Sequence, residues 1–317
     1  MNWQPAAQLE QLQARAQLLA RIRGFFAQRE VLEVETPLLC ASGITDPAIE
    51  PLKVERGVSI TAPRYLQTSP EYAMKRLLAA GSGPIYQLTR AFRDGEAGGR
   101  HNPEFSILEW YRPSFDHHQL MVEVAELIIE CLGEQPVEYI SYQQLFQQLL
   151  AVDPHNAEAA ELEELAVEYL DPGTLSGDKD LWLDLLMSHV LEPQLAGRGL
   201  CFIYDYPASQ AALSQIVDVD GVPVGQRFEL YVNGVELANG YRELTDAAEQ
   251  RQRFEADNLR RREYALPEYP IDQHLLAALD YGLPECSGVA LGVDRLLMLL
   301  TGVRDISEVL SFDWHRA

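Results

Sequence analysis

The chain has 317 residues, 47% of them hydrophobic, and its 48 acidic and 25 basic side chains give a formal net charge of −23 at pH 7. This length allows one large domain or two smaller ones, and the composition is typical of a globular protein with a sizeable core. Because affinity for nucleic acid depends mostly on neutralisation of phosphates by Lys and Arg, the charge argues against a large nucleic-acid interface.

The N-terminus and the cysteines bear on the cellular compartment. The first residues lack a basic stretch followed by an apolar core, so they do not predict a secretory signal, and no apolar run is long enough for a transmembrane helix. The cysteines have neither disulfide-type nor metal-type spacing; they are Cys40, Cys131, Cys201 and Cys286. We therefore expect reduced core residues in a cytoplasmic protein.

The first eighty residues predict two helices and a strand. Apolar residues recur at intervals of three and four between Gln8 and Arg29, the pattern of an amphipathic helix, and residues 31–39 form a β-rich run with Pro37 near its end. A second helix is expected from Glu71, within the segment TSPEY. A glutamate in a first helical turn has a structural explanation, because it favours the positive helix end. The alternative is that Glu71 receives the ammonium group of a substrate.

Residues 83–112 predict two strands joined by a polar loop. Residues 85–92 alternate with a period of two, and an aromatic strand resumes at Phe105. The loop 94–102 holds three glycines and no large apolar side chain, so it should be polar and mobile. Cationic side chains can grip phosphate oxygens and an aromatic ring can stack on a base. The segment therefore indicates a nucleoside triphosphate site that uses Arg93, Arg100, His101 and Phe105; the alternative is a basic surface hairpin.

The middle of the chain is less informative. Residues 116–132 predict a helix with Asp116 as its N-cap, and the two histidines at its start, His117 and His118, should be solvated. Residues 133–200 are expected to be an inserted or peripheral helical region.

Residues 227–244 predict a hairpin that carries acidic side chains. The pair Asn233-Gly234 between two alternating runs is a strong two-residue turn signal. Glu236 and Glu243 are seven positions apart, so a regular strand would place them on opposite faces, whereas a bulge or break at Asn239-Gly240 would let them converge. Two converging carboxylates near a triphosphate would suit Mg²⁺, and the alternative is an exposed acidic hairpin.

Near the C-terminus the sequence SGVALGVDRLLMLLTG predicts a strand that runs into an apolar helix. Gly292 lies at the end of the strand, and the helix begins near Asp294. We expect Gly292 to let an adenosine approach the backbone and Arg295, in the first helical turn, to aim at a terminal phosphate.

Taken together, these segments resemble a known family. FRDGEAGGRHNPEF resembles motif 2 of class II aminoacyl-tRNA synthetases in its lysyl-type variant, and GVDR before an apolar helix resembles motif 3. The first helix, strand and proline resemble motif 1, which builds the dimer interface in that family. Motif 1 would lie at about residues 20–40, motif 2 at about 83–112 and motif 3 at about 286–302. The resemblance implies an α+β fold, a class II aminoacyl-tRNA synthetase-like antiparallel β-sheet flanked by helices, in a single catalytic domain over residues 1–317.

The resemblance also implies an adenylate-forming reaction with ATP and Mg²⁺. Arg93 and Arg295 would be the catalytic residues. ATP would be bound by Arg93, Asp94, Gly95, Glu96, Arg100, His101, Asn102, Phe105, Glu236, Leu237, Gly292 and Arg295, and the metal by Glu236 and Glu243. The substrate would be bound by Ser69, Pro70, Glu71, Glu109, Tyr111, Asn239, Glu243 and Ala290. Acids and a phenol in this set suit a substrate with two ammonium groups, because a buried cation must be paired.

The sequence departs from lysyl-tRNA synthetases at three points. The motif 2 glutamate, Glu96, is displaced by one position, and Ala290 stands where those synthetases have a glycine, so its methyl group would shrink the pocket. Motif 1 begins close to the N-terminus, which leaves no room before it for their anticodon-binding barrel. Such a core resembles the synthetase paralogues that attach (R)-β-lysine to a lysine side chain of elongation factor P, a tRNA-shaped protein.

This resemblance implies elongation factor P as the protein substrate, (R)-β-lysine as the small substrate and a homodimer, with neither a membrane nor tRNA as a partner. Two alternatives stay open. The same adenylating chemistry would serve another acceptor, tRNA or a small amine, and a non-catalytic dimer would serve as a regulator. The sequence by itself does not choose between β-lysine and α-lysine.

Overall fold

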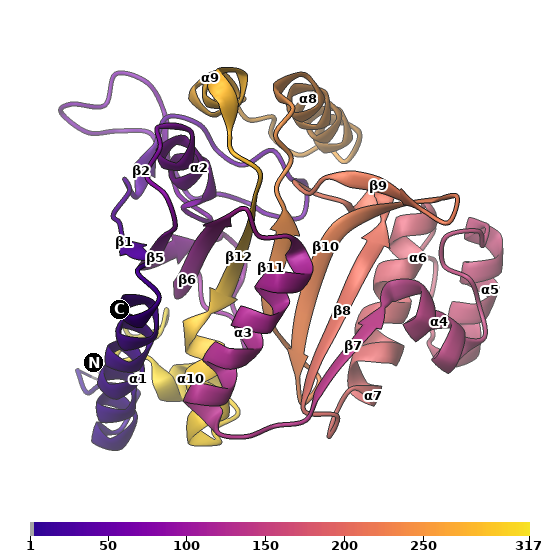
Figure 1. The fold of residues 1–317 in the computed structure, drawn as a ribbon, viewed down its shortest axis with the longest axis horizontal. Coiled ribbons are helices and arrows are strands. Elements are labelled where there is room, and N and C mark those ends of the chain that lie inside the picture. The colour runs from indigo at the N-terminus through magenta and orange to yellow at the C-terminus, as the bar shows by residue number, and fades with distance from the viewer. Residues whose placement is uncertain (1–2) are drawn as a thin grey trace. The chain divides into compact units, whose positions relative to one another are not determined.

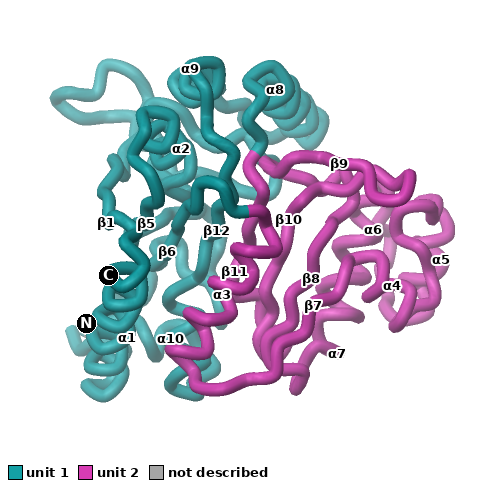
Figure 2. The backbone as a smooth tube through the Cα atoms, in the orientation of Figure 1, with its two compact units in different colours: residues 1–115, 244–317 teal, residues 116–243 magenta. Residues whose placement is uncertain are grey.

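The computed structural model describes residues 3–317; residues 1 and 2, which fall in the predicted catalytic domain, lie outside the described residues. The chain folds into two compact units (Figure 2). Unit 1 comprises residues 1–115 and 244–317, and unit 2 comprises residues 116–243. The predicted motifs 1, 2 and 3 all fall in unit 1, and the predicted acidic hairpin falls in unit 2.

The main strands of unit 1 carry motifs 2 and 3. They lie side by side in the order β1 (Leu32–Glu33), β5 (Ile85–Phe92), β6 (Glu104–Pro113) and β12 (Cys286–Gly292) (Figure 1). The β5–β6 and β6–β12 pairs are antiparallel, whereas β1 runs parallel to β5. A separate small sheet has the order β2 (Leu39–Cys40), β4 (Arg64–Leu66) and β3 (Lys53–Val54).

Helices pack on these strands through apolar faces. The buried residues of α1 (Leu9–Gln28) include Leu18, Ile22 and Phe26, the spacing of one helical face, and the ring of Phe26 stacks on Tyr86 with centroids 4.3 Å apart. The other helices of this unit are α2 (Glu71–Ala79), α8 (Ala247–Glu263), α9 (Gln273–Gly282), α10 (Val293–Thr301) and the short 3₁₀ helix η3 (Ile306–Val309).

Unit 2 combines a second set of strands with a helical region. Its strands have the order β11 (Val235–Arg242), β10 (Val222–Val232), β8 (Leu200–Pro207) and β7 (Val137–Ser141), and β9 (Ile216–Val219) also pairs with β10. These pairs are antiparallel except β7–β8, which is parallel. The helical elements are α3 (His117–Leu132), α4 (Tyr142–Leu150), α5 (Ala159–Tyr169), α6 (Lys179–Leu186), the π-helix η1 (Met187–Leu191), α7 (Glu192–Gln194) and η2 (Ala208–Gln210).

The expected α+β class, with mainly antiparallel strands and flanking helices, is confirmed. The expected helices at residues 8–29, 71–80 and 116–132 are present within one residue at each end, and Asp116 forms the capping box of α3. Residues 133–200 hold α4 to α7 together with the strand β7 and the first residue of β8, so this region is largely helical. Among the described residues, no helix is both long and apolar enough to cross a membrane.

Two local expectations were wrong. The run 31–39 forms only the two-residue strand β1 and the start of β2, because Pro37 offers no N–H for a strand ladder and the intervening backbone leaves β5 after Val34. His117 is buried, not solvated: its ring lies against the tilted ring of His118 with centroids 4.1 Å apart, and its Nε2 lies 3.4 Å from Asp205 Oδ1. Only the fold brings Asp205 of β8 to the start of α3.

The cysteines largely match their prediction. All four are free thiols; Cys131, Cys201 and Cys286 are buried, and Cys40 is half-buried. Burial raises the pKa of the Cys201 thiol to about 12, so this cysteine is an inert core residue.

Candidate active site

Arg93 and Phe105 face one another across the open end of the β5–β6 hairpin. Their closeness follows from the antiparallel register, in which Phe92 lies opposite Glu104 and the N–H of Arg93 donates a 2.9 Å hydrogen bond to the Pro103 carbonyl. The guanidinium carbon of Arg93 lies 5.1 Å from the centroid of the Phe105 ring. A cation and an aromatic face thus share one short stretch of surface, as a nucleotide requires.

The loop between the two strands is held in place at several points. A backbone bridge joins Gly98 to His101, the N–H of Ile306 donates to the Gly99 carbonyl at 2.8 Å, and the N–H of Asp94 donates to the Glu50 carbonyl at 2.7 Å. Gly95 has a φ of +76°, a conformation that favours glycine. The displaced glutamate, Glu96, remains close to Arg93: its Oε1 lies 3.6 Å from Arg93 Nη1.

Arg295 meets His101 of this loop. Arg295 Nη2 and His101 Nε2 are 2.6 Å apart, although the residues are 194 positions apart in the chain. Partial burial, followed by the positive charge of Arg295, lowers the pKa of His101 below its ordinary 6.5. A neutral imidazole accepts a hydrogen bond from the guanidinium, so the two side chains form a cationic pair of total charge +1. Gly292 lies one turn before Arg295, and the three atoms nearest to a Cβ built there belong to the Arg295 side chain, at 3.6–3.7 Å.

Asn102 is already engaged within the protein. Its Nδ2 donates to the Glu104 carbonyl at 2.7 Å, and its Oδ1 accepts from the N–H of Trp314 at 2.9 Å. The side chain therefore holds the loop end and the C-terminal segment together. A direct contact between Asn102 and ATP stays a prediction.

The predicted amino-acid residues of unit 1 form a hydrogen-bonded group around Glu109. This carboxylate is 2% exposed and accepts from Ser69 Oγ at 2.8 Å and from Tyr111 Oη at 2.6 Å. Ser69 Oγ in turn accepts from the backbone N–H of Glu71 at 3.0 Å. Ala290 of β12 lies directly opposite Glu109 in the β6–β12 register, so its methyl group borders this carboxylate.

Glu71 is joined by a lysine that the sequence analysis did not single out. Lys75 is 1% exposed, and its Nζ lies 2.6 Å from Glu71 Oε1. The i, i+4 spacing on α2 was a readable signal of this pair. A pocket of about 270 Å³ opens beside these residues; its lining includes Ser69, Pro70, Glu71, Cys40 and Asp272.

In unit 2 the acidic hairpin has the predicted turn but a different bulge. Asn233 and Gly234 have φ values of +52° and +74°, which a two-residue turn of this kind requires. The register passes from Tyr231 opposite Glu236 to Leu230 opposite Ala238, so Leu237 is the extra residue. The expectation of a bulge at Asn239-Gly240 was wrong in position, because the ladder continues regularly through both residues.

The bulge at Leu237 still has the predicted consequence. Glu236, Asn239 and Tyr241 lie opposite Tyr231, Glu229 and Arg227, which alternate along β10, so all six share one face of unit 2. Glu243 continues the same alternation, two residues beyond Tyr241, and is 1% exposed. Because of the one extra residue at the bulge, Glu236 and Glu243 lie on the same face although they are an odd number of residues apart.

A further carboxylate that sequence reasoning missed, Glu229, lies on this face. It is 7% exposed and accepts hydrogen bonds from Asn239 Nδ2 at 3.2 Å, Tyr206 Oη at 2.8 Å and Tyr231 Oη at 2.6 Å. Arg227 forms an ion pair with it. Burial, and then the charge of Glu229, raise the pKa of Tyr206 well above 10, so its hydroxyl remains a donor. The period-two spacing of Arg227, Glu229 and Tyr231 was the available signal.

The carboxylates of β11 and the residue just beyond it fit a hard divalent cation, which takes oxygen ligands. Glu236 is partly exposed and Glu243 is buried on the same face. Within residues 3–317 there is no cluster of three or more His, Cys, Asp or Glu side chains that would hold a metal by itself. This combination suits Mg²⁺, which binds proteins through one or two carboxylates and completes its coordination with phosphates and water.

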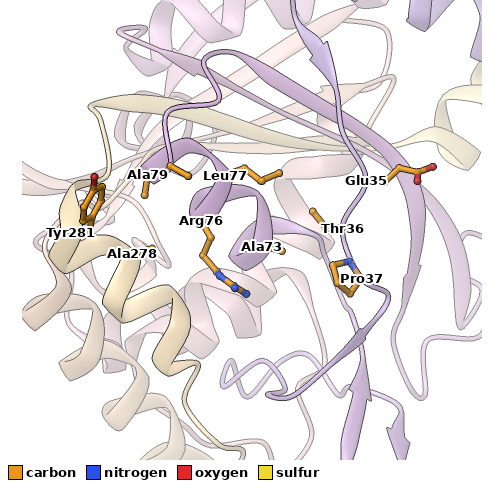
Figure 3. Close-up of a pocket in the computed structure, with 10 residues that line it drawn as sticks. Glu35, Thr36, Pro37, Ala73, Arg76, Leu77, Ala79, Ala278 and Tyr281 are labelled. Carbon is orange, nitrogen blue, oxygen red and sulfur yellow. The ribbon is translucent and has the colours of Figure 1, made fainter.

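A larger hollow of about 640 Å³ lies beside the predicted motif 1. Figure 3 shows the Arg76 side chain extending from α2, with Glu35, Thr36 and Pro37 on one side and Ala278 and Tyr281 of α9 on the other. Neighbouring apolar side chains are exposed, including Leu32 at 55% and Tyr281 at 83%. This surface therefore has room for contact with another chain.

The structure thus places a cation and an aromatic ring on the hairpin of motif 2, and an arginine at the junction of strand and helix in motif 3. Residues 3–315 match the family described as tRNA synthetases class II (D, K and N). The chain belongs to this family. The matched residues include all three motifs that the sequence predicts.

Curated relatives narrow the similarity within class II. The chain is 51% identical to a protein named elongation factor P–(R)-beta-lysine ligase of Edwardsiella ictaluri, over 322 aligned residues that cover 100% of this chain and 98% of the relative. The proteins of the same name from Proteus mirabilis and Salmonella paratyphi B are 51% and 50% identical, with the same coverage. The chain thus resembles these ligases from end to end.

Proposed function

We propose that this class II synthetase-like chain is an ATP-dependent ligase that activates (R)-β-lysine as an adenylate and transfers it to a lysine side chain of elongation factor P. The relatives named above, similar over their full length, support this substrate and acceptor. The structural observation that carries the proposal is the Glu109 group: a buried carboxylate with Ser69 and Tyr111 as its donors, opposite Ala290. Such an anion pairs with the ammonium group of a diamino acid.

In the first step a carboxylate oxygen of the amino acid attacks the α-phosphorus of ATP. A new oxygen–phosphorus bond forms, the bond from the α-phosphorus to the bridging oxygen breaks, and pyrophosphate leaves with the electron pair. The carboxylate is already a nucleophile, so no base is needed. Positioning and charge stabilisation therefore supply the rate enhancement.

Each cationic side chain that the sequence predicts to bind ATP has a role in this step. Arg93 holds the α-phosphate, and the nearby ring of Phe105 stacks on adenine. The Arg295–His101 pair and Arg100 take the distal phosphates, which leave as pyrophosphate. Gly95 and Gly292 leave space for the nucleotide next to the backbone, since a Cβ at Gly95 would meet nothing within 4 Å.

Mg²⁺ would be held by Glu236 and Glu243, next to Leu237 at the bulge. When bound, the ion neutralises phosphate charge and orients the departing pyrophosphate. Glu243 also accepts from a substrate ammonium group together with Asn239. Chelation of Mg²⁺ should abolish adenylation and leave the folded chain intact.

In the second step the side-chain amine of the acceptor lysine attacks the adenylate carbonyl. A carbon–nitrogen bond forms, the bond to the AMP oxygen breaks, and the amine proton passes to solvent. Glu71, Glu109 and Tyr111 keep the β-lysyl group in place during this exchange. We further propose that residues 1–317 form one catalytic domain, that it acts in the cytoplasm as a homodimer through residues 20–40, and that tRNA is not a substrate.

The test is the intact mass of purified elongation factor P after incubation with this protein, ATP, Mg²⁺ and either (R)-β-lysine or α-lysine. We expect an increase of one lysyl group, larger with (R)-β-lysine, and no increase without ATP or with Arg93→Ala. No increase while ATP–pyrophosphate exchange persists would assign another acceptor, tRNA or a small amine. Absence of both reactions would favour a non-catalytic regulator.

A further inference from the structure

Arg15 of α1 lies outside the predicted motifs and has no role in the proposed chemistry, yet its side chain makes several contacts. Its guanidinium forms an ion pair with Asp294, donates from Nη1 to Ser106 Oγ at 3.2 Å, and donates to the Val309 carbonyl from Nε at 3.3 Å and from Nη2 at 2.9 Å. The Asp294 carboxylate also accepts from the backbone N–H of Ser106 at 2.6 Å. One planar fork thus joins three elements, α10, β6 and η3.

Each of these three elements adjoins a predicted ATP contact. Asp294 directly precedes Arg295 in the first turn of α10, and Ser106 directly follows Phe105 in β6. Val309 ends η3, whose first residue, Ile306, donates to the Gly99 carbonyl at 2.8 Å and so holds the loop that carries Arg100 and His101.

Net stability does not explain why ionic groups occupy this position. The side chains of Arg15 and Asp294 are only 14% and 3% exposed. Removing two charges from water costs about as much as their attraction returns, so a buried ion pair adds little compared with well-packed apolar side chains. Its distinctive property is directional: a rigid guanidinium fork fixes several partners at once, which a flexible ammonium group does not.

We propose that Arg15 and Asp294 are positioning residues for ATP: they fix β6, α10 and η3 relative to one another, and thereby fix Phe105, Arg295 and the His101 loop in the arrangement that binds the nucleotide. Neither residue touches ATP in this scheme. The inference rests on the proposed function only in that ATP binds at these residues.

The decisive variant is Arg15→Lys, because it keeps the charge next to Asp294 but cannot reach Ser106 and Val309 at the same time. If only the ion pair with Asp294 matters, lysine will preserve ATP binding. If the simultaneous contacts with Ser106 and Val309 matter, lysine will not preserve it. Binding of ATP with Mg²⁺ is measured by titration calorimetry without any amino acid, and stability by thermal unfolding. Arg262→Met is the control, since Arg262 lies on α8 of the same unit, outside the predicted motifs, and pairs with Glu268 at 2.8 Å in an exposed position.

We expect Arg15→Lys to unfold near the wild-type temperature but to bind ATP about tenfold more weakly, with the KM for the amino acid unchanged. Arg15→Met should show at least the same loss of ATP affinity, and Arg262→Met should bind ATP as the wild type does. Wild-type ATP affinity in Arg15→Lys, or equal losses for ATP and the amino acid, would overturn the inference and leave the proposed function standing. A wild-type protein that does not bind ATP would overturn both.

Discussion

Arg295 and His101 are joined by a 2.6 Å contact between Nη2 and Nε2, across 194 positions of the chain. This contact requires an unprotonated Nε2, because a guanidinium has no acceptor. Partial burial and the charge of Arg295 lower the pKa of His101 and so favour that neutral form. The contact between the arginine of motif 3 and the loop of motif 2 therefore depends on the protonation state of His101.

The first prediction concerns the pH dependence of stability. In the unfolded chain His101 takes up a proton near its ordinary pKa of 6.5, whereas in the folded protein its pKa is lower. The unfolded state binds more protons between these two values, so the free energy of unfolding falls as pH falls through 6.5 and levels off below the folded pKa. His101→Gln keeps an acceptor for Arg295 but removes the titration. Denaturant unfolding at about pH 7.5, 6.5 and 5.5 should show a smaller loss for His101→Gln than for wild type; equal losses would refute the assignment.

The second prediction concerns the arginine of motif 2. Arg93→Ala should lower the kcat of ATP–pyrophosphate exchange by about 10²–10³-fold, the usual cost of losing one preorganised donor to developing charge. Arg90→Ala is the matched control: Arg90 lies on the same hairpin, is 44% exposed and approaches Glu104 at 3.6 Å. We expect the control to retain exchange within a factor of about two, since surface ion pairs contribute little. Comparable losses in both variants would indicate a general disturbance of the hairpin.

The third prediction concerns recognition of the amino acid. Glu109→Gln replaces an anion by a neutral amide of nearly the same shape, whose single carbonyl oxygen accepts from either Ser69 or Tyr111, while the other hydroxyl turns to accept from the amide NH2. The KM for the diamino acid should rise by about 10- to 100-fold, the usual worth of a hydrogen bond to a charged group, and the KM for ATP should not change. Glu104→Gln, at an exposed position of the same strand β6, should leave both constants unchanged. A rise in the KM for ATP alone would assign Glu109 to the nucleotide instead.

The fourth prediction concerns the hairpin that carries Glu236. Gly234 has a φ of +74°, and a Cβ there would lie 2.9 Å from the Glu192 carbonyl oxygen, whereas Gly221 has a φ of +85° with nothing within 4 Å. Gly221→Ala therefore measures the left-handed conformation alone, about 1–2 kcal/mol. Gly234→Ala should cost clearly more in denaturant unfolding, because the carbonyl must also move. Equal losses of unfolding free energy in the two variants would show that the Glu192 carbonyl moves away at no measurable cost.

Much of the local structure was predictable because it depends on neighbours a few residues away. The period of two in residues 85–92 predicts β5, Asp116 predicts the start of α3, and Asn233-Gly234 predicts a turn whose two residues both have positive φ. The prediction for residues 31–39 was wrong for a related reason. Their side chains favour a strand, but the number of them that join a sheet depends on the parallel pairing with β5, which is distant in the sequence.

The sequence by itself determined the order of the three motifs, the class II family and the residue types at the candidate site. Only the tertiary structure decided that the bulge falls at Leu237, that Lys75 is buried against Glu71, that Glu229 gathers four donors, and that Arg15 meets Asp294. Backbone preferences act over a few residues, whereas side-chain partners distant in the chain, such as Arg15 and Asp294, meet only when every intervening element has packed.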